Sequence, residues 1–347
     1  LTLYHILCKR RERMVATIRL AVAHGVLIAW RRGELLATTP QEADLVAGIV
    51  LKGTPLIRWA MQYALHPAPI SVSICAVFCH QAPIVAFGPD PRESCELGDI
   101  LFAFVHSPRH GPIRRNALLF QAKASAQRPH RLRPDDAAQL RLYREWPDFE
   151  YSRASSLTGQ WRSVTPREPH AGAQYLLIDD TPPASPTCGL LGPSGPNRVE
   201  TCMPNERLWG REHLAAELFG LLTCRSGRPF DDRVSSLARH DWSRVVWDLI
   251  EIGLRKAFTR RNSGWTREPR FSGETAFDLD GRSFARTSSP HSSRTAAEIL
   301  GRDGVRLLYE DPGDFPPSNV ARIPERREPE EGVSVVLIET SEGTGNE

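Results

Sequence analysis

An acidic residue followed, about twenty positions later, by an amide-x-lysine triplet is the feature of this sequence most able to do chemistry. The acidic residue is Asp99, and the triplet is Gln121-Ala122-Lys123. If the two segments form an antiparallel hairpin about the loop at 107–115, Asp99 lies opposite Lys123. Because side chains alternate along a strand, Gln121 then lies diagonally adjacent on the same face. We therefore expect a carboxylate, an amide oxygen and an ammonium to converge at one end of a sheet.

This group suits the hydrolysis of phosphodiester bonds with Mg²⁺ or Mn²⁺. Mg²⁺ takes oxygen ligands, few of them from protein, and keeps waters and substrate phosphate oxygens in its shell. Asp99, the side-chain oxygen of Gln121 and the backbone carbonyl of Ala122 can supply those ligands. The cation would acidify a bound water, and Lys123 would orient that water and add positive charge near the transition state.

Hydrophobic patterning predicts the elements that must position these residues. Thr39 and Pro40 open a helix in which Glu42 occupies the place of a capping-box acid, and a second helical piece covers 56–65. The apolar run at 15–30 is ambiguous between helix and buried strand. Further along, we expect strands at 70–78, 97–105 and 117–122, with 84–87 extending the same sheet, a helix from Pro134 that ends before Pro147, and a strand at 175–178. The order is helix, three strands, helix, strand.

These residues, in this order, resemble the PD-(D/E)XK nuclease superfamily. The helix after the triplet contains Gln139-Leu-Arg-Leu-Tyr143, which is similar to the Gln-x-x-x-Tyr motif of the RecB-like branch. The resemblance implies an α/β fold with a restriction-endonuclease-like core. It also implies metal binding by Asp99 and Gln121, catalysis by Lys123, and a place for Gln139 and Tyr143 beside the active site.

The resemblance covers roughly residues 40–180 and has departures. In the family the first helix often adds an acid, for which Glu42 is the best match; capping its own helix is the alternative role. Gln121 replaces the usual acid, and no Pro precedes Asp99. The metal ligands expected from the sequence are thus Asp99, Gln121, Ala122 and Glu42.

Basic residues surround the triplet. No acidic residue lies between Asp99 and Asp135, whereas seven Arg or Lys residues do. The net charge is only +3, so affinity for nucleic acid must come from such local clustering. A solvated loop in an Arg-rich chain is the alternative. The residues expected to contact phosphates are Arg109, Arg114, Arg115, Arg128 and Arg131.

The distribution of Pro and Gly predicts the organisation of the chain. We expect an N-terminal extension at 1–38, the nuclease-like core at 39–181, a Pro/Gly-rich linker at 182–204, and a mixed α/β accessory region at 205–347. In the last region, helices are predicted near 212–222 and 242–258, a poorly ordered stretch at 262–294, and a strand at 333–338. Met14 follows a basic run and can serve as the native start.

The cysteines and the apolar run bear on the compartment. Seven scattered cysteines without a signal peptide indicate free thiols in a reducing cytoplasm. The run at 15–30 contains Arg19 and His24 and is too short for a bilayer span. We therefore expect a cytoplasmic protein that does not enter membranes.

The function expected from these observations is metal-dependent cleavage of nucleic acid, with DNA favoured over RNA, in defence or repair by analogy with the family. Two other interpretations stay open. One is a nuclease-like module that binds nucleic acid or a protein without cutting, which Gln121 favours. The other is a sensor or interaction protein that acts through residues 205–347, by a partner or by oligomerisation.

Overall fold

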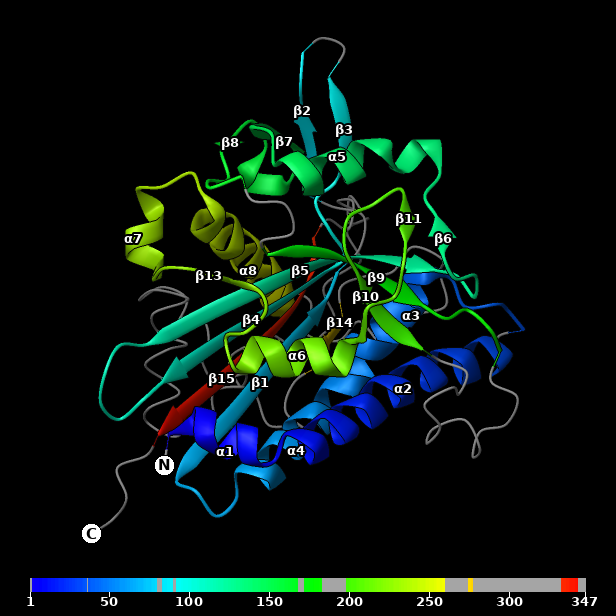
Figure 1. The fold of residues 1–347 in the computed structure, drawn as a ribbon. Helices are drawn as coiled ribbons and strands as arrows, with labels where there is room; N and C mark the ends of the chain where they lie inside the picture. Colours follow the sequence, from blue (N-terminus) through cyan, green and yellow to red (C-terminus); the bar gives the residue numbers. More distant parts are fainter. Residues whose placement is uncertain are drawn as a thin grey trace, which may run out of the picture.

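Two strands whose residues are mostly buried lie at the centre of the main sheet: β4 (Ile100–Ser107) and β5 (Arg114–Ala124). The strand order is β12-β10-β9-β5-β4-β15-β1-β14, with β13 paired to β5. Strands buried on both sides need cover on each face, and Figure 1 shows helices on both faces of this mixed α/β fold. The computed structural model describes residues 2–35, 37–79, 83–89, 92–167, 172–182, 198–259, 274–276 and 332–342.

The other strands fall into three groups. The main sheet also contains β1 (Ile70–Phe78), β9 (Ala173–Ile178), β10 (Val199–Cys202), β12 (Glu212–His213), β13 (Arg228–Pro229), β14 (Glu274–Ala276) and β15 (Ser334–Glu342). A smaller sheet of order β3-β2-β7-β8 contains β2 (Ile84–Phe87), β3 (Glu93–Glu96), β7 (Phe149–Arg153) and β8 (Trp161–Arg162). A third, two-stranded ribbon pairs β6 (His130–Arg131) with β11 (Arg207–Leu208).

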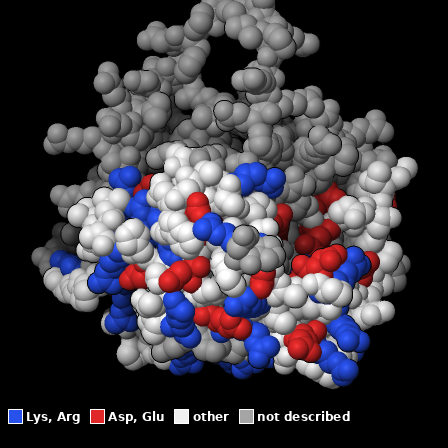
Figure 2. All heavy atoms as spheres, turned by 90° about the horizontal axis from the view of Figure 1, so that it is seen from above, with Lys and Arg blue, Asp and Glu red and all other residues white. Residues whose placement is uncertain are grey.

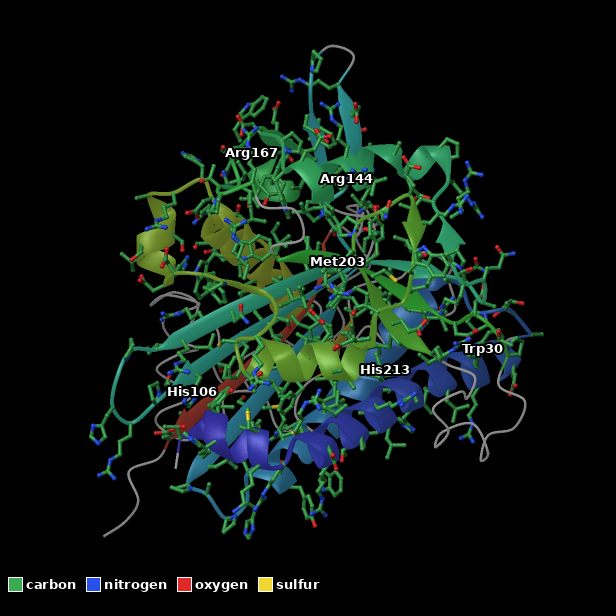
Figure 3. The ribbon with its side chains drawn as sticks, viewed as in Figure 1. Trp30, His106, Arg144, Arg167, Met203 and His213 are labelled. Atoms are coloured by element: carbon green, nitrogen blue, oxygen red, sulfur yellow. The ribbon has the colours of Figure 1, made fainter. Side chains whose placement is uncertain are left out.

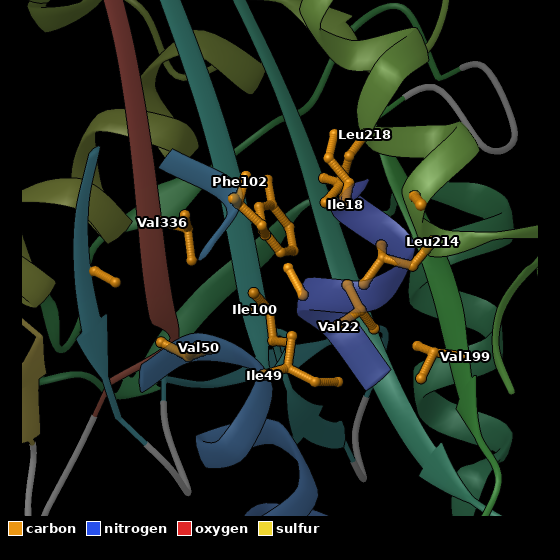
Figure 4. Close-up of a cluster of buried hydrophobic side chains, with 14 of the residues drawn as sticks. Ile18, Val22, Ile49, Val50, Ile100, Phe102, Val199, Leu214, Leu218 and Val336 are labelled. Atoms are coloured by element: carbon orange, nitrogen blue, oxygen red, sulfur yellow. The ribbon is translucent and has the colours of Figure 1, made fainter. Parts of the chain in front are cut away.

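One face of the main sheet is covered by the N-terminal helices together with α6 from the second half of the chain. Figure 4 shows Ile18 and Val22 of α2 near Phe102 of β4, with Leu214 of α6 in the same cluster. This burial of alternate sheet residues against apolar helix faces is the main force that holds the layer together. The helices are α1 (Leu3–Lys9), α2 (Arg11–Leu35), α3 (Glu42–Ala47), the π-helix η1 (Gly48–Gly53), α4 (Thr54–Leu65) and α6 (Leu214–Leu222).

The ambiguous apolar run at 15–30 forms helix α2. Within the described ranges, this is the one helix long and apolar enough to cross a membrane, at residues 11–31, and 56% of its most apolar stretch is buried inside the protein. The helix crosses η1 closely, because a Cβ at Gly25 would lie 2.5 Å from the carbonyl oxygen of Gly48. In this structure α2 packs as a core helix.

The opposite face of the main sheet is covered by helices α5 and α8 and by the smaller sheet. The aromatic residues that pack there are Tyr143 of α5, Trp146 just after α5, and Trp242 of α8. They lie against the inner side of the small sheet. The elements on this side are the 3₁₀ turn η2 (Pro134–Asp136), α5 (Ala137–Glu145), η3 (Ser155–Leu157), α7 (Arg233–Leu237) and α8 (Trp242–Thr259).

Strand β15 lies between β1 and β4, parallel to β4 and antiparallel to β1. Strand β10, from the predicted linker, pairs with β9. The predicted linker at 182–204 and accessory region at 205–347 are therefore not separate from the sheet: the described parts of both contribute strands to it. The rest of the linker at 183–197, and the predicted poorly ordered stretch apart from 274–276, lie outside the described residues.

Most predicted elements are confirmed, including both helices beyond residue 205 and the strand that begins near 333. Two predictions need correction. The strand expected at 97–105 begins only at Ile100, because Gly98 and Asp99 form a bend after β3. Strand β2 does not extend the main sheet but joins the smaller one. The six cysteines that the structure describes are free thiols.

Candidate active site

The observed register of β4 and β5 differs by two residues from the predicted one. Ile100 pairs with Phe120, so Asp99, just before β4, comes level with Gln121 rather than with Lys123. The predicted direct opposition of Asp99 and Lys123 is therefore wrong. Alternation specifies the face of a strand but not which same-face residue is opposite. A shift of two leaves the same residues facing the α5 side.

Two carboxylates take the place of a missing strand beside the end of β5. Pairing with β4 stops at Phe120. Beyond it, the backbone amide of Ala122 donates to Asp99 Oδ2 at 2.7 Å, and the amide of Ala124 donates to Glu42 Oε2 at 3.0 Å. Buried amides need such acceptors. Asp99 and Glu42 thus meet at one sheet edge, where they bind alternate amides at the end of β5.

Glu42 reaches this edge because it is not used to cap its own helix. The sequence predicts a capping box between Thr39 and Glu42. The structure instead forms the box with Gln41 and Asp44, whose carboxylate accepts the Gln41 backbone N–H at 2.8 Å. The capping interpretation of Glu42 is therefore wrong, and its side chain is directed to the strand end.

Helix α5 holds the site from the other side through the two residues of the Gln-x-x-x-Tyr pattern. Gln139 Nε2 donates to Gln121 Oε1 and also to the Glu96 carbonyl at 3.0 Å. The Tyr143 hydroxyl donates to the Leu97 carbonyl at 2.9 Å and is fully buried. Gln139 therefore touches the triplet directly, whereas Tyr143 can only position the chain that leads to Asp99.

Gly98 allows this close passage over α5. A Cβ at this position would lie 2.8 Å from Leu119 Cδ1 and 2.9 Å from the Tyr143 hydroxyl. Any other residue would require the Leu119 and Tyr143 side chains to shift, so glycine favours the close passage that presents Asp99 to β5.

Lys123 forms an ion pair that the sequence did not predict. Its Nζ lies 2.7 Å from Asp136 Oδ1, and both side chains are 16% exposed. Burial lowers the pKa of the ammonium, whereas three neighbouring carboxylates raise it and prevail. These belong to Glu42, Asp136 and Asp99. Lys123 is therefore a stable cation at neutral pH.

The acidic residues carry an excess of negative charge in a dry setting. Burial raises the pKa of Asp99 well above its ordinary value, and repulsion from Glu42 and Glu96 raises it further. Burial likewise raises the pKa of Glu42, and the Lys123 ammonium opposes this. Such a raised pKa reports a carboxylate that lacks sufficient positive charge.

The donor set fits a hard divalent cation by its chemistry. Carboxylates of Asp99 and Glu42 and the amide oxygen of Gln121, which has a second lone pair besides the one used by Gln139, are the oxygen ligands that Mg²⁺ takes. Among the residues described, no three Asp, Glu, His or Cys side chains form such a site by themselves. The buried Tyr175 hydroxyl, level with Gln121 in the sheet, has no hydrogen-bond partner in the described part of the chain.

The arginines of the hairpin loop lie far from this site. Arg114 begins β5 and Lys123 is near its end, so at about 3.3 Å per residue they are about 30 Å apart. In Figure 3, His106, which pairs with Arg114, lies low on the left, whereas Arg144 of α5 lies above the sheet near the centre of the view. The prediction that the loop cluster flanks the site is wrong, because it ignored the length of the hairpin. The cluster consists of Arg109, Arg114 and Arg115.

The two remaining predicted arginines are at the correct end. Arg128 is engaged internally: its Nε lies 2.7 Å from Glu200 Oε2, and its guanidinium also donates to the Ser125 carbonyl. It thereby holds the turn after β5 against β10. Arg131 is exposed on β6.

Sequence reasoning missed two contributors. They are Asp136, in the turn before α5, and Glu96, at the end of β3. Both act through tertiary contacts, Asp136 with Lys123 and Glu96 through its charge and its carbonyl. The Asp-rich start of α5 was the only available signal for Asp136.

No protein-family model, curated protein or solved structure matches this chain.

Proposed function

We propose that the protein is a metal-dependent nuclease of PD-(D/E)XK type that hydrolyses phosphodiester bonds in the cytoplasm. The observation on which this rests is the contact of Asp99 with the backbone of Ala122. This contact brings Asp99 to the Gln121-Ala122-Lys123 triplet on the α5 face of the sheet, close to the Lys123 ammonium.

A restriction-endonuclease-like core is part of the proposal. Its support is the path helix α3–α4, strand β1, the antiparallel pair β4–β5, helix α5, and strand β9 parallel to β5. The insertion of β15 between β1 and β4 departs from a simple core of this order.

Each residue has a role in this proposal. Asp99, Gln121 and Glu42, with the Ala122 carbonyl, would hold Mg²⁺ or Mn²⁺, which supplies an acidified water and charge neutralisation. Lys123 binds and orients the phosphate or the water. Gln139 holds the Gln121 amide so that its oxygen faces a fixed direction.

One specific observation favours a second candidate, a nuclease-like module that binds nucleic acid without cutting it. Lys123 is paired with Asp136, and the Gln121 oxygen already accepts a bond from Gln139. Both groups are satisfied without a substrate, as they would be in a purely structural network.

The experiment is a cleavage assay. Labelled single- and double-stranded DNA and RNA are incubated with the full chain across a titration of Mg²⁺ and Mn²⁺, with EDTA as the blank. Metal-dependent cleavage that is lost in Asp99→Asn and kept in Asp180→Asn, an exposed aspartate, is expected. Binding without cleavage under all conditions would support the non-catalytic module instead.

A further inference from the structure

The two-stranded ribbon β6–β11 has the same pattern on both strands. One strand continues as Arg131-Leu132-Arg133 and the other as Arg207-Leu208-Trp209. Leu208 is fully buried, and Leu132 packs against the core under the ribbon. Because side chains alternate, the flanking residues face outward: Arg131, Arg133, Arg207 and Trp209 are all exposed.

The outward residues are held in an arrangement that costs stability. Arg131 lies directly opposite Arg207 in the ribbon register. Like charges at such positions repel each other. Within the described ranges, neither of them nor Arg133 forms an ion pair. A partner with negative charges would therefore relieve the repulsion between these arginines.

Trp209 adds a flat apolar surface to these charges. Its side chain is 60% exposed, the largest exposure of any tryptophan in the described part of the chain. Cationic side chains beside an exposed aromatic ring are the combination that binds unpaired nucleotides, with phosphates on the arginines and a base on the ring. A base inside a duplex cannot offer its face in this way.

The ribbon is connected to the candidate active site through one carboxylate. Asp136 Oδ2 accepts the backbone N–H of Arg133 at 2.9 Å, and Asp136 Oδ1 accepts from Lys123. His130 of β6 is close enough to Lys123 and Asp136 for both to influence its pKa, although burial has the largest effect and lowers it. A strand lying on the ribbon would therefore lead toward Lys123.

The face that is uppermost in Figure 1 carries charges of both signs. Figure 2 shows basic and acidic side chains interspersed on it, with no broad field of one sign. On this face, a broad basic surface is therefore not what would attract a nucleic acid.

We infer that the β6–β11 ribbon binds single-stranded nucleic acid through Arg131, Arg133, Arg207 and Trp209 and directs it to the site at Lys123. The inference deepens the proposed function and depends on it for the fate of the strand. The binding itself can be measured without any cleavage.

The test measures fluorescence anisotropy of labelled oligothymidylate and oligouridylate with the full chain in EDTA, from about 50 to 200 mM salt. Arg131→Ala and Arg207→Ala should each weaken binding and reduce the slope of log K against log salt by about 0.7. Trp209→Ala should weaken binding about tenfold and leave the slope unchanged, because stacking releases no counterions. The two oligonucleotides separate DNA from RNA as the preferred source of the strand.

Matched controls come from the far end of the sheet and the opposite helix layer. Arg109→Ala and Arg114→Ala are exposed arginines of the hairpin loop, and Trp59→Ala removes a tryptophan that is 56% exposed on α4. These should leave binding unchanged. Wild-type protein that does not bind single strands, or ribbon variants that bind like wild type, would overturn the inference. If the ribbon inference fails, cleavage of duplex DNA in Mg²⁺ by the same ribbon variants would still support the nuclease proposal.

Discussion

Asp99 illustrates how a functional residue is maintained at the expense of stability. Its carboxylate is buried with Glu42 and Glu96 nearby, and one backbone amide is the hydrogen-bond donor described for it. A charge kept in a dry site without full compensation destabilises the folded state. Such strain is common where a group waits for a cation or substrate.

The pH dependence of stability follows from the sign of this shift. The pKa of Asp99 is higher in the folded chain than in the unfolded one. The folded state therefore keeps a proton that the unfolded state has lost, and stability falls as pH rises above the ordinary aspartate range. Asp99→Asn removes this penalty and still offers an oxygen to Ala122.

At pH 7, the free energy of unfolding of Asp99→Asn should therefore be about 1 kcal/mol higher than that of wild type. The variant should accordingly unfold at a higher urea concentration. The gain should shrink toward pH 4. Urea denaturation at several pH values measures it, with Asp180→Asn as the exposed control. A variant that is less stable than wild type across the whole range would show that the Asp99 charge is well compensated in the folded protein.

At the scale of elements, the sequence predicted which face of a strand each side chain occupies. It predicted less well which strands lie side by side and in which register. Alternation placed Asp99 and the triplet on one face, and the apolar spacing located α5 and its Gln139–Tyr143 pair. The register and the position of β15 were not predictable in the same way. The apolar run of β15 at 335–338 is buried on both sides, and such a run does not specify which strands lie beside it.

The same difference between local and long-range information applies to the site residues. Local signals identified Asp99, Gln121, Lys123 and Gln139, which meet in the structure. Asp136, and the direction of Glu42, depended on contacts between distant segments and had no local signal. The hairpin arginines were misplaced because proximity in sequence was taken for proximity in space.

Strand β15 should be essential to the main sheet. Val336 is fully buried in the middle of this strand and pairs with Phe102 of β4 and Ala76 of β1. Val336→Asp should therefore destabilise the fold by about 3 kcal/mol or more, the cost of an uncompensated buried charge. Circular dichroism during thermal unfolding measures the effect.

The matched control is Val234→Asp in the first turn of α7, where the side chain is 77% exposed. An acid in the first turn of a helix is well tolerated. If both variants unfolded like wild type, β15 would not be an integral strand of the sheet.

At the scale of the whole molecule, both halves of the described chain contribute strands to the main sheet. The candidate site lies at the end of β5, between the helix layer that provides Glu42 and the layer that provides Gln139. Beyond residue 205, the described chain supplies β11 and β15 as well as the helices α6, α7 and α8. It therefore completes the fold around the site.

The central claim is that Lys123 acts in metal-dependent cleavage, and single-turnover cleavage of labelled nucleic acid in saturating Mg²⁺ tests it most directly. The comparison is between Lys123→Ala and Lys52→Ala, the latter an exposed lysine on η1. The loss of a positioned charge at the reacting group should slow cleavage about 10²- to 10³-fold for Lys123→Ala, with Lys52→Ala at the wild-type rate and both variants folded. Equal rates for wild type and Lys123→Ala would contradict the assignment of this site.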